Sequence, residues 1–380
     1  MTAPDDPETI DVRPGERLEL DRLEPWLRAH LEGAEGPLEI RQFGGGHANL
    51  TYLLRFGAAE FVLRRPPHGT IAPSAHDMAR EHRVLSRLWR AYPLAPRGFI
   101  HCADPAVIGA EFHVLERRRG IVIREANAER ALAGPETCRR VGSAIVDSLA
   151  DLHRVHPEDV GLGDLGRPEG FIERQLEGWD RRWEAARDDA APALGALIAW
   201  LRTERPESRV HALVHNDFKL DNMLFAKDDP GRAVAVLDWD MCTRGDPLAD
   251  LGTLLNYWNE RDDPDGWRTA TSMPSDRPGF PGRRAACERY LARTGFDGAA
   301  LTWYWCFATF RTAVILQQIY IRWLRGETAD ARFASFGARV RALADKAEAI
   351  AGQIVPQARL EQHPIGWNRQ GRSTDGVKLL

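Results

Sequence analysis

The sequence predicts an α+β fold of two lobes, a small antiparallel β lobe followed by a large, mainly helical lobe. Three short runs with the residue preferences of β-strands, residues 38–43, 51–56 and 60–66, follow one another with only short connections. After Arg117 the apolar residues take on helical spacing, and most of the remaining chain keeps it. A chain of 380 residues, 43% of them hydrophobic, is long enough to build two such cores.

The same patterns divide the chain into four segments. Residues 75–89 carry apolar residues at helical spacing and residues 111–117 return to strand character, so both are assigned to the small lobe. The Pro- and Gly-rich residues 261–283 are expected to form a long loop. The expected segments are an N-terminal extension (1–37), the small lobe (38–117), the helical lobe (118–355) and a C-terminal tail (356–380).

Composition narrows the class of function. A net charge of -4 gives no sign of nucleic-acid binding or of a polybasic membrane anchor. Five widely spaced cysteines argue against a disulfide framework and a zinc site, and the acidic N-terminus lacks the apolar core of a signal peptide. Arg311, Gln317 and Gln318 interrupt the apolar residues 301–324, which favours a buried helix over a membrane span. We expect a cytoplasmic protein with small-molecule ligands, and its oligomeric state stays open.

A cluster of polar residues marks a candidate site in the helical lobe. In VHNDFKLDNMLF, residues 214–225, six polar residues stand within eight positions between two apolar runs, more than turn capping accounts for. His215, Asp217, Lys219 and Asn222 give the pattern H-x-D-x-K-x-x-N. Phosphoryl transfer needs these residue types, because it requires a carboxylate beside the nucleophile and hard oxygen ligands for a metal ion.

A second motif follows at a matching distance. Asp238 lies sixteen residues after Asn222, in VAVLDWDMCTRGDPLADLG, where a strand would place its carboxylate beside Asn222. With HNDFKLDN, DWD and GDPLADLG in this order, the chain resembles the aminoglycoside phosphotransferase and choline kinase superfamily over roughly residues 38–330. The segment LRRPP, residues 63–67, is similar to the subgroup associated with acyl-CoA dehydrogenases. The resemblance implies a protein-kinase-like fold.

The resemblance also implies roles for individual residues. Asp217 is the expected base and Lys219 a catalytic partner near the γ-phosphate, while Asn222 and Asp238 are the expected magnesium ligands. Arg64 stands where the family has a lysine, with Glu81 as its expected ion-pair partner. The expected nucleotide-binding residues are Gly44, Gly45, Gly46, Asn49, Val62, Arg64, Glu81 and Glu116, and the expected supporting residues are His215, Asp240, Asp246 and Asp250.

Several assignments keep an alternative. His215 braces the loop or ligates a metal, Asp240 assists the metal or caps the next segment, and the three glycines form a phosphate cradle or a plain hairpin. Asp246 and Asp250 brace the catalytic loop or cap the helix that follows.

The expected activity is transfer of a phosphoryl group from ATP, with GTP possible, to a hydroxyl of a small molecule in the presence of Mg²⁺. A neutral or anionic acceptor such as a hydroxyacyl thioester is favoured by Arg311, Arg322 and Arg325, whereas the acidic residues 260–265 favour a cationic aminoglycoside. Arg64 in place of lysine keeps open a pseudokinase that acts as an interaction protein. A Ser-His-Asp hydrolase is excluded, because no G-x-S-x-G elbow is present.

Overall fold

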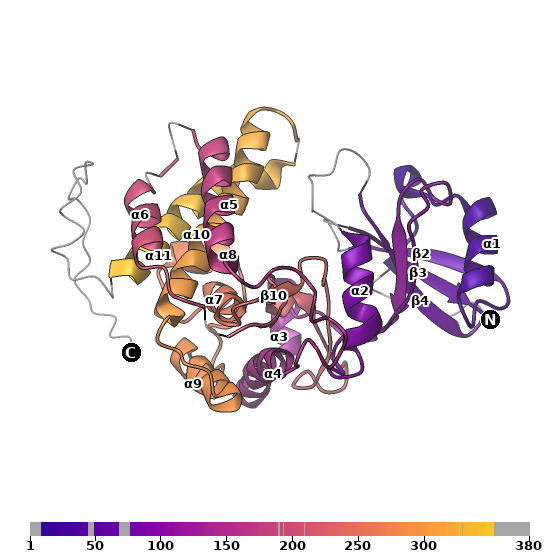
Figure 1. Ribbon diagram of the computed structural model, residues 1–380, viewed down its shortest axis with the longest axis horizontal. Helices are drawn as coiled ribbons and strands as arrows, with labels where there is room; N and C mark the ends of the chain where they lie inside the picture. Colours follow the sequence, from indigo (N-terminus) through magenta and orange to yellow (C-terminus); the bar gives the residue numbers. More distant parts are fainter. Residues whose placement is uncertain are drawn as a thin grey trace.

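The computed structural model describes residues 9–44, 49–67, 77–188, 191–192, 194–208, 210–328 and 330–352. These residues form two lobes side by side, a β lobe on the right of Figure 1 and a helical lobe on the left. Each lobe has its own hydrophobic cluster, as the predicted bilobal α+β fold requires. No helix in the described ranges combines the length and hydrophobicity that crossing a membrane demands.

The small lobe is built on one antiparallel sheet. Its order is β1-β2-β3-β4-β6-β5, with the strands β1 (Thr9–Ile10), β2 (Leu38–Phe43), β3 (Leu50–Phe56), β4 (Ala59–Arg65), β5 (Gly98–Cys102) and β6 (Phe112–Glu116). Side chains alternate between the two faces of β6. Phe112 and Val114 join the core under helix α1 (Leu20–His30), whereas His113 contacts Glu81 of helix α2 (Met78–Leu88) on the other face. The α2 side of the sheet therefore faces the helical lobe (Figure 1).

The three predicted strands, the strand at 111–117 and the helix within 75–89 are confirmed. Three elements of the small lobe were not predicted, the short strand β1 among them. Strand β5 is short and lacks a clear alternating pattern. Helix α1 lies inside the segment expected to be an extension, yet its Leu23 and Leu27 are fully buried against the sheet and β1 pairs with β2. Residues 9–30 are thus an integral layer of the small lobe.

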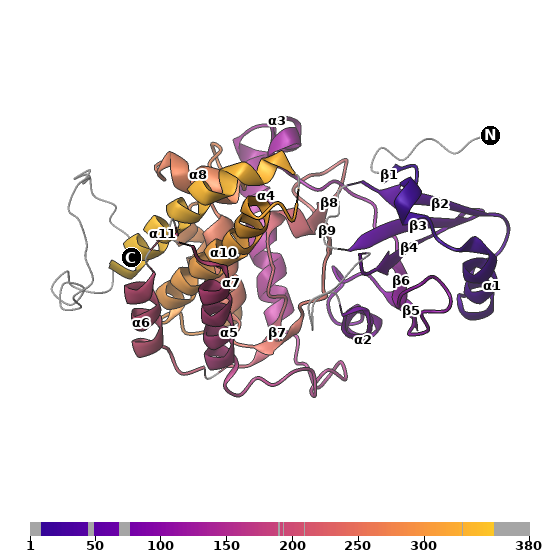
Figure 2. The ribbon, with the colours of Figure 1, turned by 90° about the horizontal axis from the view of Figure 1, so that it is seen from above.

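The large lobe packs helices around α10. Figure 2 shows α10 and α11 side by side, with α5 and α7 against α10. The helices are α3 (Ala128–Ala131), α4 (Pro135–His153), α5 (Phe171–Ala186), α6 (Gly195–Thr203), α7 (Leu248–Tyr257), α8 (Asp265–Thr271), α9 (Arg283–Thr294), α10 (Leu301–Leu324) and α11 (Phe336–Gly352). Short 3₁₀ turns occur at Pro14–Glu16, Glu125–Asn127, Leu220–Asn222 and Ala331–Ser335.

Two small two-stranded ribbons flank the loops that carry the predicted site residues of this lobe. Strand β7 (Ala212–Val214) pairs with β10 (Thr243–Gly245), and β8 (Met223–Phe225) pairs with β9 (Ala233–Val236), all antiparallel. The connection between the lobes is anchored to the second ribbon, because Ile121 exchanges backbone hydrogen bonds of 2.7 and 2.9 Å with Phe225. Gly120 permits this approach, since a Cβ there would lie 2.6 Å from the Phe225 carbonyl oxygen.

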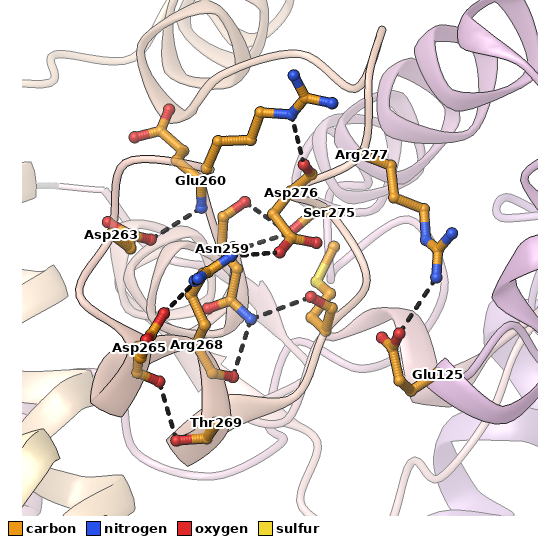
Figure 3. A network of polar contacts seen from close by, with 12 residues as sticks. Glu125, Asn259, Glu260, Asp263, Asp265, Arg268, Thr269, Ser275, Asp276 and Arg277 are labelled. Carbon is orange, nitrogen blue, oxygen red and sulfur yellow. Dashed lines mark hydrogen bonds and ion pairs between the residues drawn. The ribbon is translucent and has the colours of Figure 1, made fainter.

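The prediction of one long loop over residues 261–283 was wrong in part. Helix α8 occupies Asp265–Thr271, and polar contacts tie the rest of the segment together (Figure 3). Asn259 donates to the carbonyls of Arg268 and Met273, and the Ser275 hydroxyl accepts from the Asn259 N–H at 2.7 Å. Pro and Gly density identified the turns correctly but concealed the two-turn helix between them.

Candidate active site

The loop predicted to be catalytic, which we call the catalytic loop, is held by one buried carboxylate. Residues 215–222 connect β7 to β8, and the backbone N–H groups of His215 and Asn216 donate to Asp250 at 2.6 and 2.7 Å. Asp250 lies in the first turn of α7 and is fully buried, and it also contacts Nε2 of His153 at 3.2 Å. Burial opposes ionisation of this group, but the hydrogen bond and charge of His153 hold the pKa of Asp250 below its ordinary value. The expected bracing role of Asp250 agrees with these contacts.

His215 supports the same loop. Its Nδ1 accepts from the Asp217 N–H at 3.3 Å, which leaves the proton on Nε2 to be donated to the Leu237 carbonyl at 2.9 Å. Both ring nitrogens of His215 are therefore engaged, and bracing is the role that its surroundings support.

Asp246 accepts from the Leu248 N–H at 2.9 Å, so it caps the start of α7.

Asp217, Lys219 and Asn222 form one compact cluster. The Lys219 ammonium lies 2.9 and 2.7 Å from the two carboxylate oxygens of Asp217. The Asn222 amide nitrogen donates to the backbone oxygen and to Oδ2 of Asp217, each at 2.9 Å. Burial acts to lower the pKa of Lys219, but the charges of Tyr257 and Asp217 outweigh it and raise the pKa above its ordinary value. The predicted loop residues are thus brought together with a fixed orientation.

Arg64 links the two lobes. Its Nη1 donates to Glu81, the ion pair that the sequence predicts, and its Nη2 donates to Asp238 at 2.6 Å. Burial would raise the pKa of Glu81, but Arg64, followed by His113, holds it below its ordinary value. Arg64 likewise outweighs burial and lowers the pKa of Asp238. A planar guanidinium can bind two carboxylates at once in this way.

The segment Asp238–Asp240 is held in an uncommon conformation. Asp238 has φ of +69°, and the Leu237 N–H donates to the Asn222 carbonyl at 2.8 Å, which places Asp238 beside the catalytic loop. Trp239 is fully buried between His215 and Tyr92, and its indole N–H donates to the Val236 carbonyl at 2.8 Å.

Asp240 lies between the lobes. It accepts from the Asn49 side chain at 3.2 Å, so a residue of the small lobe reaches the segment after β9. Burial, followed by the charges of Asp238 and Glu81, raises the pKa of Asp240 to about 7. The two expected roles of Asp240, assisting a metal ion and capping the next segment, both stay predictions.

The remaining nucleotide-site predictions are only partly within the described residues. Gly44 follows β2, whereas Gly45 and Gly46 lie outside the described residues. Val62 is buried on β4, and its neighbour Phe61 pairs with Glu116 at the end of β6, which brings Val62 and Glu116 near each other. The Glu116 N–H donates to the Arg97 carbonyl at 2.8 Å. The backbone N–H of Glu116 is therefore already engaged within the small lobe.

Three residues of this site were not predicted in the role that they have. His113 is fully buried on β6, and its Nε2 lies 3.0 Å from Glu81, so it secures the partner of Arg64. His153 holds Asp250 as described above. Arg311 of α10 donates to the Asn216 carbonyl at 2.6 Å and to the Thr253 hydroxyl at 3.2 Å. No local motif identifies them, because each acts across a long sequence separation.

The charges assigned to the acceptor side need correction. Arg311 was expected to face the acceptor, but it is buried and supports the catalytic loop. Arg322 and Arg325 are exposed near the end of α10. In the acidic run 260–265, Glu260 and Asp263 both pair with the buried Arg283, and Asp265 pairs with Arg268. This run is largely neutralised inside the loop network and does not form an acidic acceptor pocket.

Comparison with known sequences agrees with this arrangement. The model of a phosphotransferase enzyme family matches residues 39–281, more than half of the chain. Acyl-CoA dehydrogenase family member 11 of Gallus gallus is 32% identical over 356 residues, which cover 90% of this chain and 44% of the relative. Acyl-CoA dehydrogenase family member 10 of Mus musculus is 32% identical over 348 residues, which cover 90% of this chain and 32% of the relative. The chain spans less than half the length of these curated relatives.

Solved structures share the fold. A protein of Ralstonia eutropha JMP134, provisionally described as an aminoglycoside phosphotransferase, is 30% identical with a TM-score of 0.76, covering 89% of this chain and 99% of the other. A thermostable mutant of aminoglycoside phosphotransferase APH(4)-Ia, in a ternary complex with ADP and hygromycin B, is 16% identical with a TM-score of 0.53, covering 85% and 97%. The second likeness shows the fold alone. The chain therefore belongs to the phosphotransferase enzyme family and has its kinase-like, bilobal fold.

Proposed function

We propose that this chain is an ATP- and magnesium-dependent phosphotransferase that phosphorylates a hydroxyl group of a small molecule. The observation that carries the proposal is the convergence of Asp217, Asn222 and Asp238, with Arg64 reaching Asp238 from the other lobe. Phosphoryl transfer depends on positioning and on charge stabilisation, and this arrangement supplies both.

The residues fit a bound nucleotide. Arg64 uses its two terminal nitrogens on carboxylates, while its Nε is buried without a hydrogen-bond partner among the described residues. A buried donor without an acceptor is costly, and a phosphate oxygen would satisfy it. Arg64 would therefore bind the nucleotide phosphates, with Glu81 and His113 fixing its orientation.

The donor set also fits Mg²⁺. The Asn222 amide nitrogen is committed to Asp217, which leaves the amide oxygen as the atom that faces a cation. Asp238 supplies a carboxylate whose pKa is lowered, so it is ionised at neutral pH. Two protein oxygens suffice, because Mg²⁺ usually keeps several waters and takes the rest of its ligands from phosphates. When bound there, the ion would neutralise charge on the transferred group.

Asp217 is the proposed base. Lys219 and Asn222 fix its carboxylate, and an acceptor hydroxyl placed within hydrogen-bond distance would pass its proton to it. Lys219 uses two contacts on Asp217 and keeps a third N–H, which suits the expected interaction with the γ-phosphate. The same contacts argue against a pseudokinase, since a scaffold has no physical need for them.

For the acceptor we propose a neutral or anionic hydroxylated molecule, in particular a hydroxyacyl thioester. Neutralisation of the acidic run removes the main feature that favoured a polycationic aminoglycoside. The curated relatives are named acyl-CoA dehydrogenase family members, which supports an acyl thioester. Phosphorylation of an aminoglycoside at ordinary enzymatic efficiency would contradict this preference.

The test begins with thermal stabilisation by ATP and by GTP, each with and without Mg²⁺. Asp238→Ala should lose the magnesium-dependent part of the stabilisation. Asp228→Ala is the matched control, because Asp228 is an exposed carboxylate in the β8–β9 turn. Hydroxyacyl-coenzyme A compounds are then screened for phosphorylation by wild type and by Asp217→Asn. No stabilisation by millimolar nucleotide would reject the proposal.

A further inference from the structure

A cavity of about 650 Å³ lies between α2 and the helical lobe. Its wall on the small-lobe side comes from Arg80 and Arg83 of α2, and its opposite wall from Arg167 and Arg174. Asn216 of the catalytic loop and Met241 close it on the side of the active site. We call this cavity the arginine pocket. Its volume is in the range of small-molecule sites and exceeds the size of a single inorganic phosphate.

The lining is strongly cationic. It contains four arginines and one carboxylate, Asp77, for a net charge of +3. Asp77 pairs with Arg80 at 3.1 Å, and Arg83 pairs with the exposed Asp164. In the described part of the chain no carboxylate pairs with Arg167 or Arg174, and the Arg174 guanidinium is held by backbone carbonyls, among them that of Glu169 at 2.5 Å.

Two helices add to this positive potential. Residues from the N-terminal turns of α2 and of α5 line the pocket, where the helix dipoles favour an anion. Figure 1 shows α2 on the side of the small lobe that faces the helical lobe. The arginines of both lobes therefore face a common space, and its excess positive charge, which the pairs with Asp77 and Asp164 offset only in part, favours a bound anion.

The pocket is joined to the active site by short contacts. Asn216 precedes Asp217 directly, so their Cα atoms are about 3.8 Å apart. The Asn216 side chain donates to the Met241 carbonyl at 2.9 Å, and Arg80 donates to the Asp240 carbonyl at 3.5 Å. A ligand anchored in the pocket thus lies beside both segments that carry the proposed base and metal ligands.

We propose that the arginine pocket binds the phosphate groups of the acceptor, so that the acceptor is a hydroxylated molecule carried on a phosphorylated handle. This inference rests on the proposed function, and it adds where the acceptor is held and which of its groups is recognised. Guanidinium groups bind phosphate oxygens through paired hydrogen bonds, which suits several arginines around one di- or triphosphorylated handle. The apolar side of the pocket, formed by Leu165, Phe171 and Met241, suits the uncharged part of such a molecule.

The first experiment measures binding of coenzyme A and of pantetheine, which lacks the phosphates, by calorimetry. The protein is saturated with Mg²⁺ and a non-hydrolysable ATP analogue, which blocks the nucleotide site. We expect coenzyme A to bind and pantetheine to bind at least about tenfold more weakly. Arg83→Gln combined with Arg167→Gln should weaken coenzyme A binding about tenfold or more and leave pantetheine unchanged.

The matched control is Arg322→Gln, an exposed arginine on α10 that pairs with Glu327 outside the pocket. Equal binding of coenzyme A to the wild type and to the pocket variant overturns the proposal. Loss of coenzyme A binding on addition of the ATP analogue overturns it too, because the ligand then occupies the nucleotide site. Unchanged thermal stabilisation of the variant by Mg²⁺ and ATP shows that it is folded and keeps the two tests distinct.

The second experiment separates an acceptor site from an effector site. With a hydroxyacyl-coenzyme A substrate, the pocket variant should show a KM raised about tenfold with kcat kept, whereas the matching hydroxyacyl-pantetheine should be phosphorylated equally by both proteins. If the variant binds coenzyme A weakly but keeps its KM, the pocket does not hold the acceptor and the proposal fails. Failure of nucleotide stabilisation would instead reject the proposed function itself.

Discussion

Replacing Asp250 by Asn is the sharpest test of how the catalytic loop is held. The carboxylate accepts two backbone N–H groups, at 2.6 and 2.7 Å, and contacts His153 in a fully buried position. An Asn side chain has the same shape but one acceptor oxygen, so its amino group would face a backbone donor. One buried donor then loses its partner, which costs about 1–3 kcal/mol, and the charge-assisted contacts weaken further. We expect a total loss of about 3 kcal/mol.

Urea unfolding followed by circular dichroism measures this loss. The matched control is Asp246→Asn, in the same segment, because Asp246 caps the Leu248 N–H and Asn caps a helix as well as Asp does. The control should lose less than about 1 kcal/mol. Phosphoryl transfer should fall at least about tenfold in Asp250→Asn, because Asn216 positions Asp217. A loss of stability no greater than in the control would refute the reasoning.

Three further changes test other contacts. Arg64→Lys should weaken ATP binding about tenfold in a thermal-shift titration, since an ammonium cannot span Glu81 and Asp238 as the guanidinium does; unchanged affinity would contradict this. His113→Phe should lower the free energy of unfolding by about 2 kcal/mol in urea, because it leaves a buried carboxylate short of a donor; a neutral effect would show the contact to be dispensable. Burial lowers the pKa of Lys346 to about 7, against 10.5 for the free side chain. Between pH 7 and 10.5 the unfolded chain therefore holds a proton on Lys346 that the folded chain has released. The free energy of unfolding of the wild type should rise with pH over this range. The rise amounts to at most about 5 kcal/mol between pH 7 and 10.5, and Lys346→Met should lack it. Calorimetry at several pH values measures the free energy of unfolding, and parallel pH dependences of the two proteins would refute this prediction.

Sequence patterns within short segments predicted those strands, helices and site residues whose positions depend on neighbouring residues. Strand alternation and helical spacing located β2 to β4, β6 and α2, and the spacing of the two motifs placed Asn222 and Asp238 on neighbouring segments. Strand β5 and helix α1 escaped because they owe their position to burial against the sheet, not to a distinctive pattern. Helix α8 escaped because its few residues lie between turn signals.

The residues that hold the catalytic loop in place could not be predicted, because tertiary contacts bring them to it from distant parts of the sequence. Arg311 reaches the catalytic loop across 95 residues of sequence, and His153 reaches Asp250 across 97. A count of charged residues in a segment also fails to show which are already paired, and for this reason the acidic run 260–265 was misleading. The arginine pocket gathers its members from four separate segments, none of which is notably basic by itself.

The anchoring of Trp239 bears on how this protein is controlled. A rearrangement that withdraws Asp238 from the site would also move Trp239. It would expose the fully buried Trp239 indole, break the hydrogen bond from the indole to Val236, and break the 3.1 Å hydrogen bond from the Trp239 backbone N–H to Glu81. Together these losses disfavour an inactive state in which the carboxylate of Asp238 is withdrawn. We expect the protein to be constitutively active, so that its reaction rate depends on the concentrations of its substrates and on the amount of protein. We therefore expect inhibitors to act by competing with the substrates, since withdrawal of Asp238 would give up the contacts of Trp239.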